Sequence, residues 1–133
     1  MNIAIKKVSL KSNKGILGWL EQHPETQVVC ALAVASRRHA EHAVMETLKA
    51  FAQGRNISRK PELEFLIRLT GERQLSKAFV KSEAKGDKAV FISWSEKNPW
   101  PSFKEKFVKR ESEFEKTEDL DAIEKTSTFW LWS

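Results

Sequence analysis

Two nearly central side chains, Arg73 and Gln74, carry planar hydrogen-bond donors well suited to recognising a ligand. A guanidinium presents its N–H groups in a fixed fork that matches phosphate or carboxylate oxygens. Both groups can also pair with the edges of unstacked bases. They follow Gly71 closely and stand between two short apolar segments. We therefore expect Arg73 and Gln74 to contact bases or phosphates.

A second basic group, Arg37 and Arg38, begins a predicted helix that Ser36 can cap. A helix N-terminus carries about half a positive charge, so two arginines there oppose the dipole by some tenths of a kcal/mol each. Free backbone N–H groups beside positive side chains suit a bound phosphate. The alternative is that both arginines simply extend into solvent at small cost.

The residue types that usually carry catalysis form no familiar pattern. The chain has no Gly-Lys-Ser/Thr phosphate loop and no Gly-x-Ser-x-Gly turn, and its five glycines do not cluster. His39 and His42 could share a helix face, but a zinc site needs a further ligand that no nearby motif supplies. Cys30 lies in an apolar run and is expected to be an inert core thiol. We expect no enzyme activity, no metal and no cofactor.

The charge distribution favours a polyanionic partner for most of the chain. The net charge is +5, but residues 111–125 contain seven acidic residues against two lysines. Residues 1–110 therefore carry +10, which gives them an electrostatic reason to meet RNA. Small proteins are also often basic without binding nucleic acid, so charge alone leaves both possibilities open.

Four of the five tryptophans lie in the last forty residues, at Trp94, Trp100, Trp130 and Trp132. Aromatic rings can stack on unpaired bases, but they also fill cores and protein interfaces. For Trp130 and Trp132 we expect packing within the chain first, a protein interface second and base stacking third.

Two short helices must position Arg73 and Gln74. The first, at about 61–70, is apolar almost all round, so it must be buried on nearly every side or covered on one side by a partner. Its charged residues, Glu64 and Arg68, are four apart, a spacing worth a few tenths of a kcal/mol. Gly71 can end this helix in a left-handed conformation. A second apolar face follows, and together they indicate a helix hairpin held by another molecule. The apolar residues of the two helices are Leu63, Phe65, Leu66, Ile67, Leu69, Leu75, Ala78 and Phe79.

The remaining elements predict a single α+β domain over residues 1–133, with a small, mostly antiparallel central sheet flanked by α-helices. Helices are expected over 14–22, 36–53, 102–110 and 117–131.

Three strands are expected in this sheet. Ile3 and Ile5 alternate as in an edge strand, and the apolar parity then changes, which predicts a bulge or turn at Lys6 and Lys7. The apolar run 28–34 suits a central strand covered on both faces. A third strand is expected at 88–94.

The central segment resembles the small kinase-binding regulatory subunit of the KEOPS (EKC) tRNA-modification complex, archaeal type, a relative of the human PRPK-binding protein. The matching residues, in order, are Ser58, Glu64, Leu66, Arg68, Gly71, Arg73, Gln74, Leu75 and Ala78. The stretch 35–43 is similar to the family's strand-to-helix junction, and a strand at 86–93 and a closing helix at 123–131 also fit. Residues 95–116 match no motif of the family.

The resemblance implies a non-catalytic subunit of KEOPS, which installs threonylcarbamoyladenosine in tRNA. It implies direct binding to the small atypical protein kinase subunit, association with other subunits through that kinase, and help in recruiting tRNA by its 3′ CCA end. The expected kinase contacts are Leu63, Phe65, Leu66, Ile67, Leu75 and Phe79. The expected tRNA contacts are Arg37, Arg38, Lys60, Arg73 and Gln74. The alternative is a stand-alone basic RNA-binding module without an obligate protein partner.

The sequence also predicts a cytoplasmic location. A single cysteine agrees with a reducing compartment. The first residues lack the basic head and apolar run of a signal peptide. The longest apolar runs are too short to span a bilayer, so we expect no membrane partner.

Overall fold

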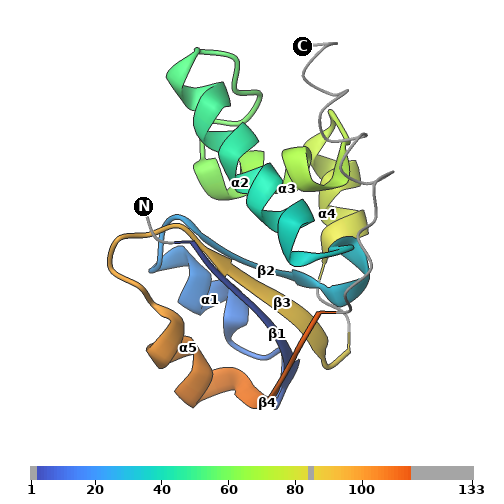
Figure 1. Cartoon of the computed structure of the whole chain (residues 1–133), viewed down its shortest axis with the longest axis vertical. Helices are drawn as coiled ribbons and strands as arrows, with labels where there is room; N and C mark the ends of the chain where they lie inside the picture. The colour runs from blue at the N-terminus through green and yellow to red at the C-terminus, as the bar shows by residue number, and fades with distance from the viewer. Residues whose placement is uncertain (1–2, 84–85, 115–133) are drawn as a thin grey trace.

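The chain folds around a four-stranded antiparallel sheet with helices on both faces (Figure 1). The computed structural model describes residues 3–83 and 86–114. The strands lie in the order β2-β3-β1-β4, with bounds β1 (Ala4–Leu10), β2 (Thr26–Cys30), β3 (Lys88–Ser93) and β4 (Val108–Ser112). The helices are α1 (Ile16–Glu21), α2 (Arg37–Ala52), α3 (Pro61–Thr70), α4 (Leu75–Ser82) and α5 (Trp100–Phe107). This confirms the predicted α+β class.

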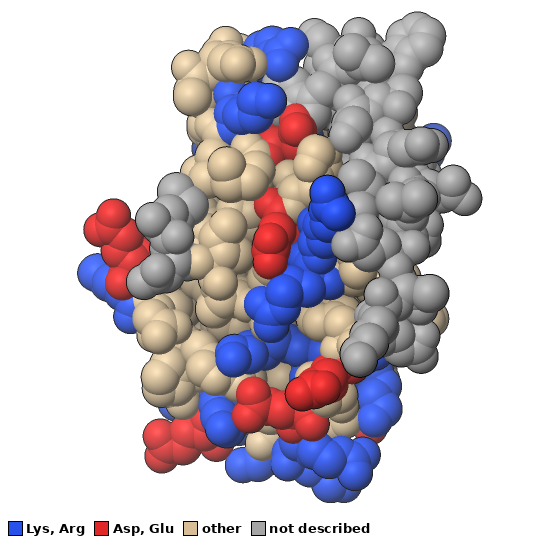
Figure 2. All heavy atoms as spheres, in the orientation of Figure 1, with Lys and Arg blue, Asp and Glu red and all other residues tan. Residues whose placement is uncertain are grey.

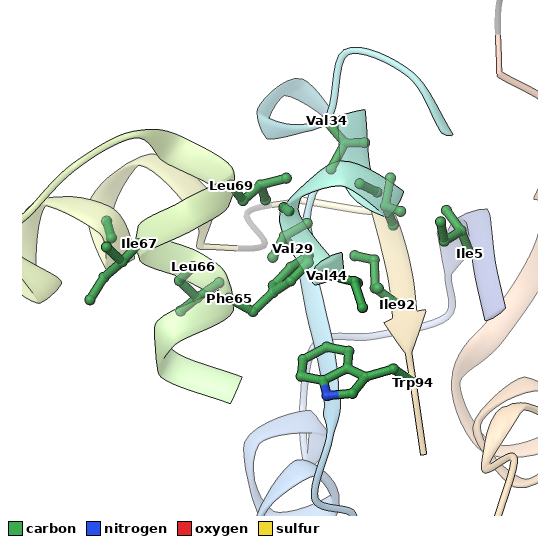
Figure 3. Packing of buried hydrophobic residues seen from close by; sticks show 14 residues of the cluster. Ile5, Val29, Val34, Val44, Phe65, Leu66, Ile67, Leu69, Ile92 and Trp94 are labelled. Carbon is green, nitrogen blue, oxygen red and sulfur yellow. The ribbon is translucent and has the colours of Figure 1, made fainter. Parts of the chain in front are cut away.

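Two apolar layers enclose the sheet. Helices α2, α3 and α4 cover one face, and α1 and α5 cover the other (Figure 1). On the first side Phe65 packs against Trp94 with ring centroids 5.3 Å apart, among the side chains drawn in Figure 3. On the second side Phe91 and Phe103 pack at 4.8 Å. Because successive strand residues point to opposite faces, each inner strand supplies side chains to both layers.

Strand β1 passes through Lys6 and Lys7 without the bulge or turn that the sequence predicted. Its register with β3 stays constant past both lysines. Ile5 packs in the layer of α2, whereas Val8 and Leu10 pack in the layer of α1 and α5. The change of apolar parity therefore reflects a strand buried on both faces, and β1 is an interior strand rather than the predicted edge strand.

The apolar run 28–34 forms a shorter strand than predicted. Strand β2 ends at Cys30, and a 3₁₀ turn (Ala31–Ala33) leaves the Leu32 side chain 95% exposed. Val28 and Val29 do pack in opposite layers, which confirms burial on both faces. However, β2 is an edge strand that pairs with β3.

The outer edge of β2 is partly closed by Gln27. The main-chain carbonyl of Glu25 accepts a hydrogen bond from the main-chain N–H of Trp94. Because bonded and non-bonded pairs alternate along an antiparallel ladder, the Val28 N–H points away from β3, toward the open edge. The Gln27 Oε1 atom accepts from that N–H at 3.2 Å, and its Nε2 atom donates to the Glu62 carbonyl at 3.1 Å. This arrangement blocks one main-chain donor that another strand could use.

The start of α2 and the end of α3 follow the predicted signals. Ser36 caps α2, its Oγ atom accepting from the His39 N–H at 3.1 Å. Pro61 occupies the first turn of α3, where its fixed φ suits a helix start. Gly71 ends α3 with a φ of 74°, the left-handed conformation expected of it.

The C-terminal part of the described chain departs from the prediction. Helix α5 ends at Phe107, and the residues expected to continue it as far as 110 begin β4, which pairs with β1. The predicted helix 117–131 lies outside the described residues.

Candidate functional site

A buried histidine fastens the start of α2 to the end of α3. His39 is 3% exposed, and its Nδ1 atom accepts from the Ala35 N–H at 3.1 Å. The acceptor role of Nδ1 requires the proton on Nε2, which then donates to the Leu69 carbonyl at 3.0 Å. The neutral ring therefore links the loop before α2, α2 itself and the last turn of α3.

This link brings the two predicted basic groups to one end of the α2–α3 pair. Arg37 and Arg38 follow Ser36 in the first turn of α2 and are exposed. Arg73 and Gln74 follow Gly71 at the end of α3 and are also exposed. We call these four residues the basic end.

Arg37 is anchored as well as exposed. Its Nη2 atom donates to the Ile5 carbonyl in β1 at 2.9 Å, so part of its donor capacity is used within the fold. The guanidinium is thereby held where α2 meets the sheet. Arg37 therefore does not simply extend into solvent, which was the alternative to a phosphate contact.

Lys60 is not part of the basic end. It precedes Pro61 at the other end of α3, a ten-residue helix whose length is about 15 Å. It is exposed, but it lies on the far side of the helix pair from Gly71. The predicted grouping of Lys60 with Arg73 therefore needs correction.

Beside Arg37 the surface is hollowed next to β1. This hollow, which we call the β1 hollow, has a volume of about 670 Å³. Its lining residues are Ile5, Lys6, Lys7, Arg37, Glu111, Ser112, Glu113 and Phe114. A stripe of Lys and Arg side chains crosses this face over the start of α2 and β1, and acidic side chains adjoin it (Figure 2).

Three of the predicted kinase contacts belong to the core. Phe65, Leu66 and Ile67 are at most 2% exposed, and they pack against the sheet, α2 and α4. The all-round apolar pattern of α3 is thus explained by burial within the chain itself. Their assignment to a partner surface needs correction, because a side chain without exposed surface cannot meet a second protein.

The other predicted contacts remain at the surface. Leu63 and Leu75 are partly buried, and Phe79 is 41% exposed. Val80, which the sequence reasoning did not single out, is 67% exposed on α4. Of the apolar face predicted from Leu75, Ala78 and Phe79, only Ala78 is buried. The apolar type of Val80, next to Phe79 in the sequence, was the available signal for a further exposed apolar residue on α4.

An apolar groove lies between α4 and α1 at the edge of β2. It has a volume of about 250 Å³. Its walls include Leu17 and Leu20 of α1 and Phe79 of α4, with Leu66 and Val28 among the lining residues. Leu17 is 75% exposed, so large apolar side chains reach solvent on both sides of the groove.

Glu64 and Arg68 form a fully buried ion pair, not a surface pair. The Arg68 Nε atom donates to Glu64 Oε2 at 2.8 Å, and neither side chain has exposed surface. The other carboxylate oxygen accepts from the Ile57 and Ser58 N–H groups at 2.7 Å each. Burial lowers the pKa of Arg68, and the Glu64 charge opposes that shift. The pair ties the loop before α3 to the helix, which gives Arg68 a structural role.

The residues considered for metal binding serve other contacts. His42 lies 3.7 Å from the Glu46 carboxylate, and burial raises the pKa of Glu46. Within 3–83 and 86–114 there is no group of three or more His, Cys, Asp or Glu side chains that could hold a metal ion. Cys30 is a partly buried free thiol.

Trp94 and Trp100 pack within the chain. Trp94 is 1% exposed, and Trp100 packs against Phe91 with ring centroids 5.2 Å apart. Trp130 and Trp132 lie outside the described residues. None of the helices in the described ranges has the length and apolar composition needed to cross a bilayer.

No protein-family model matches this chain, and a comparison with curated proteins finds no match.

Proposed function

We propose that the chain is a non-catalytic subunit that binds a protein kinase and helps recruit tRNA through its 3′ CCA end. This is the role that the KEOPS resemblance implies, with a cytoplasmic location and threonylcarbamoyladenosine as the modification served. Other KEOPS subunits would associate through the kinase. The proposal assigns RNA to the basic end and the kinase to the outer surface of α4.

The link from His39 to the Leu69 carbonyl is the observation that carries the proposal. Without it, the arginines of α2 and the Arg73–Gln74 turn would be separate surface features. With it, three guanidinium groups and one carboxamide stand at one end of the α2–α3 helix pair. Unpaired terminal nucleotides offer phosphates and base edges together, which such a set of donors can recognise.

The protein contact is supported by the exposed apolar side chains of α4. Phe79 and Val80 are adjacent in the sequence and both reach solvent. An aromatic anchor in a protein interface often contributes about 2 kcal/mol or more. Leu63 and Leu75, which are partly buried, would contribute at the margins of such a contact.

Co-purification with the kinase subunit from the same cell tests the protein half of the proposal. We expect a stable complex at micromolar concentration, and Phe79→Ala should weaken it at least tenfold, about 1.4 kcal/mol. Met45→Ala is a suitable control because Met45 is also exposed, at 50%, but lies on α2. Separate elution of the two wild-type proteins would remove the kinase from the proposal and leave a stand-alone RNA-binding module.

RNA titration of the basic end tests the other half. Replacing Arg37 and Arg38 together by alanine should weaken tRNA binding and flatten its salt dependence by about 0.7 per lost phosphate contact. An unchanged slope would mean that these arginines do not meet phosphates.

A further inference from the structure

The β1 hollow continues the basic end onto the sheet. Arg37 belongs to both, because its guanidinium is bound to the Ile5 carbonyl while its side chain lines the hollow. Lys7 stands two residues after Ile5 and therefore points to the same side of β1, the side of α2. The two cations are thus neighbours on one surface, although thirty residues separate them in the sequence.

Cations outnumber available carboxylates around this hollow. Glu111 is engaged by Lys104, with Nζ and Oε2 3.0 Å apart. Lys7 Nζ lies 5.8 Å from the centre of the Phe114 ring, so an aromatic face adjoins the positive charge. Glu113 remains on the rim as an opposing charge. A polyanion that enters from Arg37 would meet Lys7 next.

We propose that the β1 hollow holds the RNA backbone that leads away from the nucleotides bound at the basic end. This inference rests on the proposed RNA-binding function and adds to it a path across β1. Lys7 would pair with a phosphate beyond the terminal nucleotides, and the Phe114 ring would border that path. A single-strand site on one OB fold covers about 4–16 nucleotides, so on a basic surface of similar kind contacts beyond a three-nucleotide end are expected.

RNA is favoured over an acidic protein segment because the hollow is continuous with a set of donors suited to bases as well as phosphates. Arg73 could bind a carboxylate as well as a phosphate, but the planar amide of Gln74 suits base edges, which an acidic peptide lacks. The path also runs from exposed Arg38 through Arg37 to Lys7, a succession of cations such as backbone-tracking surfaces have.

The test compares Lys7→Ala with Lys49→Ala on two RNAs. Lys49 is an exposed lysine in the last turn of α2, about 18 Å along the helix from Arg37, so its loss changes the net charge equally. The RNAs are the 3′-terminal four and the 3′-terminal twelve or so nucleotides of tRNA, lengths within the known range of site sizes. Lys7→Ala should weaken binding of the longer RNA roughly fourfold at about 0.15 M salt and reduce the salt slope by about 0.7.

The short RNA should bind equally to wild type and Lys7→Ala, and Lys7→Arg should retain binding of the long one. Equal effects of Lys7→Ala and Lys49→Ala on the long RNA would overturn the inference while leaving the basic end intact. Equal losses on the short and long RNAs would also overturn it, because the contact would then lie at the terminus. A loss of kinase capture with unchanged RNA binding would assign the hollow to the protein. Absence of any RNA binding by the wild type would overturn the proposed function itself.

Discussion

Replacing Glu64 by glutamine should destabilise the fold more than replacing Arg68 by methionine, although both changes break the same ion pair. Glutamine leaves the Arg68 charge buried without a carboxylate. Because N–H donors face both oxygens of Glu64, the amide N–H₂ of glutamine would point at a donor in either orientation. Methionine leaves the Glu64 carboxylate with its bonds from the Ile57 and Ser58 N–H groups. Removing either partner of a buried pair costs about 3–5 kcal/mol. Hydrogen bonds to a charged group are worth about 1.5–3 kcal/mol each, so the two that the Glu64 carboxylate keeps should place Arg68→Met at the lower end of that range.

Urea unfolding measures both costs through the midpoint at constant m value. The double variant Glu64→Gln with Arg68→Met should lose less than the sum of the single changes, because the buried charge is then absent. Glu111→Gln provides the matched control, since its ion pair with Lys104 is about half exposed and should matter by less than about 1 kcal/mol. Equal costs for the two single variants, or a Glu64→Gln cost no greater than that of Glu111→Gln, would refute the reasoning.

Three further predictions concern other contacts of the fold. Burial raises the pKa of Glu46 above 4.5, so this group stabilises the fold fully below that value and the stability is lost as pH rises through the folded-state pKa. In thermal melts, the stability of Glu46→Gln relative to wild type should therefore increase from pH 4 to pH 7, whereas that of the exposed control Glu41→Gln should not. A difference between Glu46→Gln and wild type that stays constant with pH would contradict this. Gln27→Leu should uncover the Val28 N–H and cause concentration-dependent association in sedimentation velocity, and a monomer at all concentrations would mean that the edge is protected otherwise. His39→Leu should cost about 2–4 kcal/mol in chemical unfolding because the Ala35 N–H and the Leu69 carbonyl lose their partner, and a cost below about 1 kcal/mol would contradict the role of His39 in fastening α2 to α3.

The helix ends at Ser36 and Gly71 could be predicted because a cap depends on residues that are close in the sequence. Ser36 can cap a helix wherever it stands, and Gly71 adopts a positive φ at little cost. The all-round apolar pattern of 61–70 predicted burial, which the structure confirms. It could not say whether the cover would come from this chain or from a partner.

The order of the strands could not be predicted in the same way. Strand β4 carries charged, exposed residues after Val108 and has no apolar alternation, so its strand conformation depends on pairing with β1. An apolar run such as 28–34 is compatible with an edge strand when helices cover both of its faces. Edge position is a property of the whole sheet, not of the segment.

The candidate site was predicted in its parts but not in its assembly. The types of Arg37, Arg38, Arg73 and Gln74 indicated donors for phosphates and bases. Their meeting at one end of α2 and α3 depends on the contact of His39 with a carbonyl thirty residues away. Spacing along the chain contains no information about such a contact, and for the same reason Lys7 went unnoticed.

The dependence of tRNA affinity on the CCA end tests the central proposal most directly. Binding driven by charge follows RNA length and is indifferent to the terminus, whereas recognition by a set of fixed donors depends on unpaired terminal bases. At near-physiological salt, removal of CCA should lower the affinity of the wild-type chain more than tenfold, about 1.4 kcal/mol. Removal of three nucleotides from the 5′ end should change it little, and the Arg37→Ala, Arg38→Ala double variant should lose much of the difference between the two ends. Equal losses from either end would contradict recognition of the 3′ terminus by the basic end.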